Sequence, residues 1–154
     1  MKITLTLNGV KRTDDVAPDL TLQSYLRDHG CLSVKCGCET SNCGLCTVHL
    51  DGKPVLSCSV PAVRCDGCSV VTLEGVQAEA AAFGAFLADE GAEQCGYCSP
   101  GFIMNVLAMC RELKAPTDEE ILDYLAGNLC RCSGYQGQMR AVRKYLASKE
   151  AERA

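Results

Sequence analysis

The first half of the chain alternates polar and apolar positions, as strands with one buried face do. Residues 2–7 read KITLTL, and Asn8-Gly9 follows as a two-residue turn that tolerates positive φ angles. We therefore expect a β-hairpin that returns through residues 10–16. A second hairpin is expected over residues 47–59, around an Asp-Gly turn, and a last strand over residues 69–73.

One short helix is expected between the two hairpins. Leu22, Tyr25 and Leu26 recur at helical spacing after Thr21, and Gly30 can close the helix in the left-handed conformation. Two hairpins, one helix and one strand together predict a small α+β sheet domain.

The pattern changes to helical periodicity at Gly75. Residues 79–89 are rich in alanine and are followed by Gly91, which is typical of a helix and its end. We place a domain boundary at this change, which divides the chain into residues 1–75 and residues 76–154. Each half is small enough that an apolar core alone gives little stability, and metal sites commonly compensate.

Further helix signals follow in the second half. Ser99-Pro100 combines a capping residue with a proline suited to the first helical position, so a helix is expected from there. Thr117 and Glu120 form a capping box before another helix, and a last helix is expected over residues 137–149. The second half is thus predicted to be all-helical.

Thirteen cysteines among 154 residues make the thiols the main chemical feature. The start of the chain lacks an apolar signal region, and no run approaches the roughly 18 apolar residues that a membrane span needs. We therefore expect a cytoplasmic protein with no membrane partner. In a reducing compartment, grouped cysteines are more often metal ligands than disulfides.

The net charge of the chain is −4, and its basic residues are scattered. A nucleic-acid partner is therefore not expected, because such proteins concentrate lysine and arginine on one face.

A first set of four cysteines has a diagnostic spacing. Cys38, Cys43 and Cys46 follow C-x4-C-x2-C, and Cys58 is the fourth member. All-thiolate sets suit zinc, copper(I) or iron–sulfur clusters rather than magnesium or calcium. This spacing is that of plant-type [2Fe–2S] ferredoxins.

A second set has a less specific spacing. Cys95 and Cys98 form C-x2-C, and Cys130 and Cys132 form C-x-C. Structural zinc also takes four cysteines, often from C-x2-C pairs, so the spacing leaves zinc and iron–sulfur open. Cys98 precedes a predicted helix, whose N-terminus would stabilise an anionic cluster.

Four motifs in a fixed order identify a family resemblance. GCETSNCGLCTV, DGKPVLSC, QCGYCSPG and GNLCRCSGYQ together resemble the small iron–sulfur subunit of the xanthine oxidase family of molybdenum hydroxylases, over essentially the whole chain. The resemblance implies an N-terminal β-grasp domain, like plant-type ferredoxin, followed by an all-α four-helix domain. It also implies two [2Fe–2S] clusters, the first on Cys38, Cys43, Cys46 and Cys58, and the second on Cys95, Cys98, Cys130 and Cys132.

The resemblance further implies partners and a direction of electron flow. The helical-domain cluster would lie next to molybdopterin in a large subunit, and the other cluster toward FAD in a medium subunit. Gln94 matches the family glutamine that hydrogen-bonds the pterin. Electrons would pass from molybdenum through both clusters to FAD, so the chain would be an oxidoreductase subunit without a catalytic centre of its own.

The motifs LSVKCGC and GNLCRCSGYQ look most like bacterial xanthine dehydrogenase small subunits. We therefore expect a purine such as xanthine, or another N-heterocycle, as substrate of the complete enzyme. Aldehyde, nicotinate and carbon monoxide enzymes share the motifs. A free-standing ferredoxin-type carrier and a zinc-stabilised interaction module are the alternatives from other functional classes.

Two positions depart from the family pattern. Ser41 stands where glycine is usual, and Gly137-Gln138 stands where Asn-Ile is common. Because a residue with a Cβ is disfavoured at positive φ, Ser41 puts the local backbone in question. His29 and His49 have no partner at metal-ligand spacing and are interpreted as surface or strand residues.

Five cysteines remain outside the two sets. We interpret them as small reduced side chains, with the last of them buried on an apolar helix face. They are Cys31, Cys36, Cys65, Cys68 and Cys110.

Overall fold

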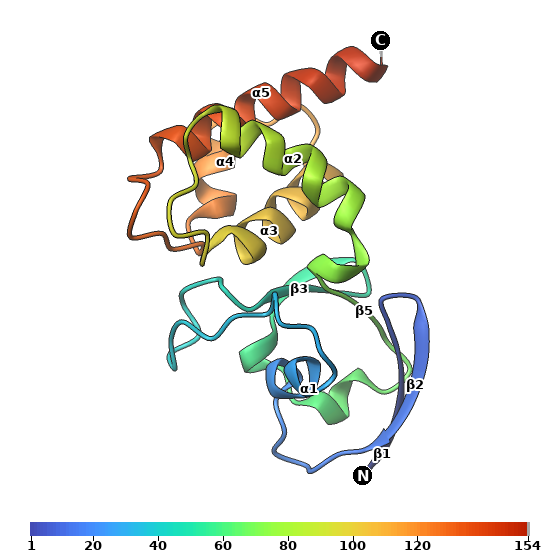
Figure 1. The fold of residues 1–154 in the computed structure, drawn as a ribbon. Helices are drawn as coiled ribbons and strands as arrows, with labels where there is room; N and C mark the ends of the chain where they lie inside the picture. The colour runs from blue at the N-terminus through green and yellow to red at the C-terminus, as the bar shows by residue number, and fades with distance from the viewer. Residues whose placement is uncertain (154) are drawn as a thin grey trace.

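The computed structural model describes residues 1–153, with side chains through residue 152, as a mixed sheet and one helix below four further helices (Figure 1). The two described ends of the chain lie at opposite ends of the molecule (Figure 1). The fold is therefore α+β, as the sequence predicts.

The sheet has five strands in the order β2-β1-β5-β3-β4. The two hairpins are antiparallel, β5 pairs with β1 in parallel, and β5 pairs with β3 antiparallel. Both predicted turns are confirmed, because Asn8 and Gly9 have φ of 49° and 82°, and Asp51 and Gly52 have φ of 48° and 82°. The strands are β1 (Lys2–Leu7), β2 (Val10–Asp15), β3 (Thr47–Leu50), β4 (Lys53–Leu56) and β5 (Ser69–Val71).

The second hairpin is shorter than predicted. Strand β4 ends at Leu56, and Ser57–Ser59 forms a 3₁₀ turn instead of continuing the strand to residue 59. The Ser57 backbone N–H and hydroxyl both donate to the Cys46 carbonyl oxygen, at 3.2 and 2.8 Å. These two bonds turn the chain and set Cys58 beside Cys46. The last strand likewise stops at Val71.

Helix α1 (Leu22–Asp28) covers the sheet (Figure 1). Thr21 caps it by accepting from the Ser24 N–H at 3.1 Å, and Gly30 follows it with φ of 86°, as predicted. The helix buries its apolar side chains against the sheet in one core, because the strands place alternate residues on that face. That core includes Leu5, Leu7, Leu22, Leu26, Val48 and Val70.

The second half contains four helices around a second core, which includes Phe83, Phe102, Val106, Ile121 and Tyr145. The helices are α2 (Gln77–Asp89), α3 (Ser99–Glu112), α4 (Asp118–Leu125) and α5 (Gln136–Arg153).

Helix boundaries differ from the prediction in two places. Ser99 is the first residue of α3 rather than its cap, and Cys98 occupies the cap position without a side-chain bond. The predicted cap of α3 is therefore one residue too late in the sequence. The last helix begins at Gln136 and continues to Arg153, beyond the predicted end at residue 149.

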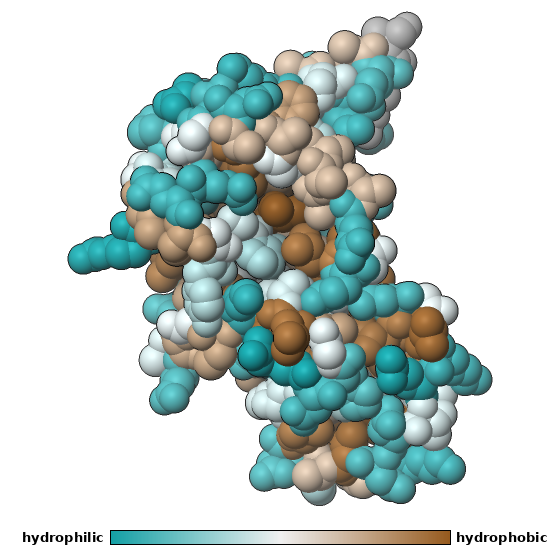
Figure 2. Space-filling view, viewed as in Figure 1, coloured by the Kyte–Doolittle hydropathy of each residue, from teal (hydrophilic) through white to brown (hydrophobic). Residues whose placement is uncertain are grey.

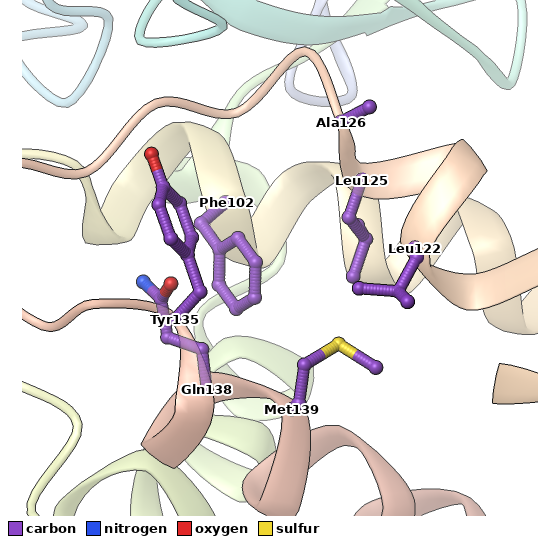
Figure 3. Close-up of a pocket in the computed structure, with 7 residues that line it drawn as sticks. All are labelled: Phe102, Leu122, Leu125, Ala126, Tyr135, Gln138 and Met139. Atoms are coloured by element: carbon purple, nitrogen blue, oxygen red, sulfur yellow. The ribbon is translucent and has the colours of Figure 1, made fainter. Parts of the chain in front are cut away.

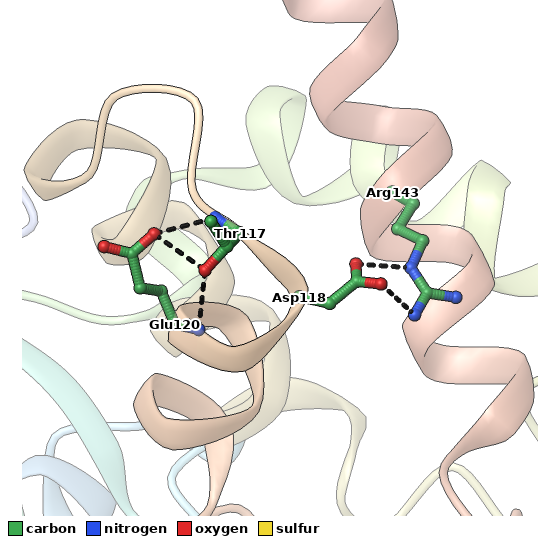
Figure 4. Close-up of polar contacts among 4 residues, drawn as sticks. All are labelled: Thr117, Asp118, Glu120 and Arg143. Atoms are coloured by element: carbon green, nitrogen blue, oxygen red, sulfur yellow. Dashed lines mark hydrogen bonds and ion pairs between the residues drawn. The ribbon is translucent and has the colours of Figure 1, made fainter.

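The capping box of α4 is confirmed (Figure 4). The Glu120 carboxylate accepts from the Thr117 N–H at 2.7 Å, and the Thr117 hydroxyl accepts from the Glu120 N–H at 3.3 Å. Arg143 of α5 donates two hydrogen bonds to Asp118, at 2.7 and 2.8 Å (Figure 4). These contacts fix the start of α4 and its position against α5.

Helix α3 contacts strand β3, so the two cores meet in one body, and hydrophobic residues are visible between the helices and the sheet in Figure 2. His49 of β3 is only 2% exposed and lies at this junction. Its Nε2 is 2.7 Å from the Met104 carbonyl oxygen, and Arg111 Nη2 is 2.7 Å from its Nδ1. Since the guanidinium can only donate, Nδ1 accepts and Nε2–H donates. Burial lowers the pKa of His49, in agreement with this neutral form.

Candidate metal centres

The loop that carries the first cysteine set directs backbone donors at one thiol. Cys38 lies between α1 and β3, and the backbone N–H groups of Asn42 and Thr40 donate to its sulfur. These bonds favour the thiolate and lower the pKa of Cys38 to about 6. The loop is therefore prepared to hold a negatively charged sulfur.

The first set lies in two close pairs. The thiols of Cys38 and Cys43 are hydrogen-bonded to each other, and so are those of Cys46 and Cys58. Burial raises the pKa of Cys46 to about 11. A Cβ added at Gly37 would lie 2.6 Å from a methyl carbon of Leu45, so a larger residue there would require the Leu45 side chain to shift.

Ser41 adopts the left-handed conformation with φ of 57°. The family glycine position is thus a positive-φ position here, and serine occupies it with some strain. Its hydroxyl oxygen lies 3.6 Å from the Cys58 sulfur. The loop accommodates this departure without moving the cysteines apart.

The second set also consists of two close pairs. The sulfurs of Cys95 and Cys132 are 3.5 Å apart, and the thiols of Cys98 and Cys130 are hydrogen-bonded. Ser133 donates to the Cys130 sulfur from its N–H at 3.4 Å and from its hydroxyl at 3.2 Å. Burial raises the pKa of Cys98 to about 12, whereas Cys95 and Cys132 are exposed.

A cavity of about 460 Å³ lies beside the second set and reaches the loop of the first. All four cysteines of the second set line it, together with Cys43 of the first loop. Among residues 1–152, no three histidine, cysteine or acidic side chains converge as a site for a single metal ion. The thiols lie in pairs instead, which is compatible with two irons that each take two thiolates. The assignment of all eight ligands stays a prediction.

Gln94 lies at the exposed edge of the second set. Its side-chain Nε2 donates to the Cys132 carbonyl oxygen at 3.0 Å, which ties the residue before Cys95 to the C-x-C pair. Contact of Gln94 with a pterin stays a prediction.

A direct connection between the two sets was missed in the sequence. The Leu129 N–H donates to the Cys43 carbonyl oxygen at 2.9 Å, so the residue before Cys130 is bonded to a ligand candidate of the first set. The Tyr97 hydroxyl also donates to the Cys36 carbonyl oxygen, at 2.9 Å. Short-range spacing carries no signal for such contacts between distant segments.

Two glycines allow the backbones of the two halves to approach. A Cβ at Gly44 would lie 2.5 Å from the Gly127 carbonyl oxygen, and one at Gly101 would lie 2.2 Å from the Gly44 carbonyl oxygen. The glycines within the sequence motifs could have indicated a close backbone contact. They do not identify the segment that each glycine contacts.

The five remaining cysteines form no disulfide among the described residues. Cys31 and Cys65 are buried, Cys36 is exposed, and Cys68 and Cys110 are half-buried. The expected burial of Cys110 is therefore only partial.

A separate apolar cavity of about 390 Å³ lies between α3, α4 and α5 (Figure 3). It adjoins the second set through Tyr135, whose hydroxyl oxygen accepts from the Cys130 N–H at 2.9 Å. Its lining residues are Phe102, Leu122, Leu125, Ala126, Tyr135, Gln138 and Met139.

Comparison with known proteins gives matches along the whole chain. Residues 72–143 match the [2Fe-2S] binding domain family. The chain is 42% identical over 144 residues to the nicotinate dehydrogenase small FeS subunit of Eubacterium barkeri, covering 92% of both chains. It is 41% identical over 141 residues to a probable xanthine dehydrogenase subunit of Bacillus subtilis (strain 168), covering 90% of this chain and 81% of that protein.

Solved structures have the same fold. A chain of quinoline 2-oxidoreductase from Pseudomonas putida 86 superposes with a TM-score of 0.88 and 34% identity, over 100% of this chain and 97% of that chain. The aldehyde oxidoreductase of Desulfovibrio gigas gives a TM-score of 0.88 and 33% identity, over 99% of this chain but 17% of that longer chain. In the described part of the chain, no helix combines the length and apolar character that crossing a membrane requires.

Proposed function

Because the chain belongs to the family of small iron–sulfur subunits of molybdenum hydroxylases, we propose that it relays electrons between a molybdopterin-bearing large subunit and an FAD-bearing medium subunit. Its part in the oxidoreductase is electron transfer, without a catalytic centre of its own. This proposal rests mainly on the placement of eight cysteines in four close pairs, with a backbone hydrogen bond between the two sets.

The pairs suggest how the thiols are shared between irons. Cys38 with Cys43, and Cys46 with Cys58, would each hold one iron of the first [2Fe–2S] cluster. In the second cluster, the same division gives Cys95 with Cys132, and Cys98 with Cys130. When bound, such clusters accept and release single electrons, and hydrogen bonds to sulfur set their potentials.

The two cysteine sets fall in different halves of the chain. We propose a ferredoxin-like β-grasp domain over residues 1–75 and a four-helix domain over residues 76–154, since each half has its own core. The first domain holds its set in the loop between α1 and β3 and in the 3₁₀ turn after β4. The second holds its set in the loops before α3 and α5, with Cys98 at the cap of α3.

We propose that the second set faces molybdopterin. Cys95 and Cys132 are its exposed thiols, and the Gln94 amide is bonded beside them. This edge could therefore approach a pterin without rearrangement of the chain. The first set would then pass electrons toward FAD.

A purine such as xanthine, or another N-heterocycle, is our proposed substrate of the complete enzyme. The proteins named after nicotinate, xanthine and quinoline support it, because all three compounds are N-heterocycles. The aldehyde oxidoreductase similarity supports an aldehyde as the second candidate. The thirteen cysteines favour the reducing cytoplasm as the location.

Co-purification tests the proposed partners. A tagged chain expressed in its native host should bring down two larger chains, one with molybdenum and one with FAD. Recovery of a monomer that retains its iron would instead support a free-standing carrier.

Gln94→Ala tests the proposed orientation. In the assembled enzyme, this change should slow reduction of the second cluster by substrate while both clusters remain, and rapid-mixing spectroscopy measures the rate. Gln136→Ala, an exposed glutamine at the start of α5, is the matched control. An unchanged rate in Gln94→Ala would remove the proposed role.

A further inference from the structure

Gln138 is a buried polar residue without a complete set of partners. It is 4% exposed, and its Oε1 has no hydrogen-bond partner among the described residues. Leaving a buried acceptor unpaired destabilises the folded chain. Such a group in a folded protein calls for an explanation, and a redox role is one of the recognised explanations.

The surroundings of Gln138 would suit an apolar side chain. It lines the cavity of Figure 3 together with Phe102, Leu125 and Met139, and its amide lies on the side of Tyr135. A methionine of similar length would fill the same space without an unpaired oxygen. Packing alone therefore does not account for the amide.

The nitrogen of the same amide faces the second cysteine set. Gln138 Nε2 is directed at the Cys98 sulfur, at 4.0 Å. A thiolate bound to iron has no hydrogen, so only an N–H or O–H group can pair with it. The orientation that gives Cys98 a donor is the one that leaves Oε1 unpaired.

The first turn of α5 holds Gln138 in place. A Cβ at Gly137 would lie 3.2 Å from the Glu90 carbonyl oxygen, so the helix start is packed closely on the end of α2. Arg140 donates to the Glu90 carboxylate at 2.6 Å, and Lys144 forms an ion pair with the same carboxylate. The amide is thus presented from a fixed helix rather than from a loop.

We propose that Gln138 raises the reduction potential of the cluster held by the second cysteine set, by donating its side-chain N–H to the Cys98 sulfur. A donor to sulfur stabilises the added negative charge of the reduced cluster more than it stabilises the oxidised one. Cys130 has donors from Ser133, and Cys95 has the backbone N–H of Tyr97. Gln138 adds a side-chain donor to Cys98, the thiol that pairs with Cys130. The inference rests on the proposed function, because it requires a [2Fe–2S] cluster at these thiols.

The test is an EPR-monitored redox titration of the purified, iron-loaded protein. Gln138→Met removes the N–H with little change in volume and should shift the one-electron equilibrium of the second cluster toward oxidation by about tenfold, which is 59 mV. The potential of the first cluster should not move. Gln138→Leu also removes the N–H and introduces no charge or new donor, so it should lower the same potential by a similar amount.

Met139→Leu is the matched control, since Met139 is the next residue and lines the same cavity. Its potentials should equal those of the wild type. The second-cluster signal is identified as the one that Cys132→Ala abolishes. An unchanged potential in iron-loaded Gln138→Met overturns the proposal, as does an equal shift in Met139→Leu.

If Gln138→Met fails to fold, Gln138→Leu decides, and an unchanged potential there also overturns the proposal. Absence of any [2Fe–2S] signal from the wild type would overturn the proposed function, and this inference with it. Normal clusters with unmoved potentials would overturn the inference alone.

Discussion

The two cysteine sets reach the same paired arrangement from different local structures. The first is carried by a loop and a 3₁₀ turn beside the sheet, with Cys43 and Cys46 buried. The second lies in the loops before α3 and α5, with Cys98 at the cap of α3 and with Cys95 and Cys132 exposed. One loop that supplies three thiols needs a fixed spacing, whereas two loops held by packed helices can bring distant pairs together. This difference explains why only the first set has a diagnostic spacing.

Removing one thiol from each set gives the largest expected effects. Cys46→Ala should lose the first cluster and destabilise the chain by several kcal/mol. The Cys46 residue is only 3% exposed, so the change leaves a cavity, and it also removes a metal ligand. Cys132→Ala should lose the second cluster at lower cost, since Cys132 is exposed. Iron content and denaturant unfolding measure both effects. Equal destabilisation would contradict the contrast between a buried and an exposed set.

The contact between the two halves predicts the next largest effect. Gly44→Ala should destabilise the protein by about 2 to 4 kcal/mol, because φ is 73° and the new Cβ would lie 2.5 Å from the Gly127 carbonyl oxygen. Gly52→Ala is the matched control, with φ of 82° but nothing within 4 Å of the new Cβ. It should cost about 1 to 2 kcal/mol, from the backbone alone. Equal costs in urea unfolding would refute close packing at Gly44.

The thiols of the two sets should also differ in their pH dependence when iron is removed. Cys38 has a pKa of about 6 in the folded chain. Its contribution to the free energy of unfolding therefore grows as pH rises from 6 toward the ordinary pKa of a thiol. Cys98 has a pKa of about 12 in the folded chain. Its contribution to the free energy of unfolding is therefore present below the ordinary pKa of a thiol and is lost as pH rises toward 12.

Alkylation of the iron-free protein near pH 7, followed by mass spectrometry, checks this contrast. Cys38 should react many times faster than Cys98, because the thiolate is the reactive form. Faster labelling of Cys98 than of Cys38 would contradict the opposite pKa shifts of these two thiols.

The contacts of Figure 4 predict the smallest effects, because they lie away from both sets. Thr117→Ala should cost about 1 kcal/mol through loss of the capping bonds. Arg143→Ala should have a smaller effect still, since its ion pair with Asp118 is exposed. Thermal unfolding measures both, and iron content should stay at the wild-type value. Loss of iron in either variant would show that the cysteine sets depend on this distant contact.

The sequence predicted the elements well where the signals were local. The Asn8-Gly9 turn, the helix after Thr21 and the capping box at Thr117 are all confirmed. In each case a few neighbouring residues determine the backbone, so the pattern and the structure coincide.

Non-local contacts could not be predicted in the same way. The bond between Leu129 and Cys43 and the burial of His49 depend on how α3 packs on β3. The start of α3 was displaced by one residue, since Cys98 occupies the cap position. The sequence suggested which thiols form each set, but their pairing within a set emerged only from packing.

EPR of the anaerobically reduced protein, combined with metal analysis, tests the central claim most directly. We predict about four irons per chain and two distinct [2Fe–2S] signals, one lost in Cys46→Ala and the other in Cys132→Ala. Zinc in place of iron, or a single cluster signal that both variants abolish, would contradict the account.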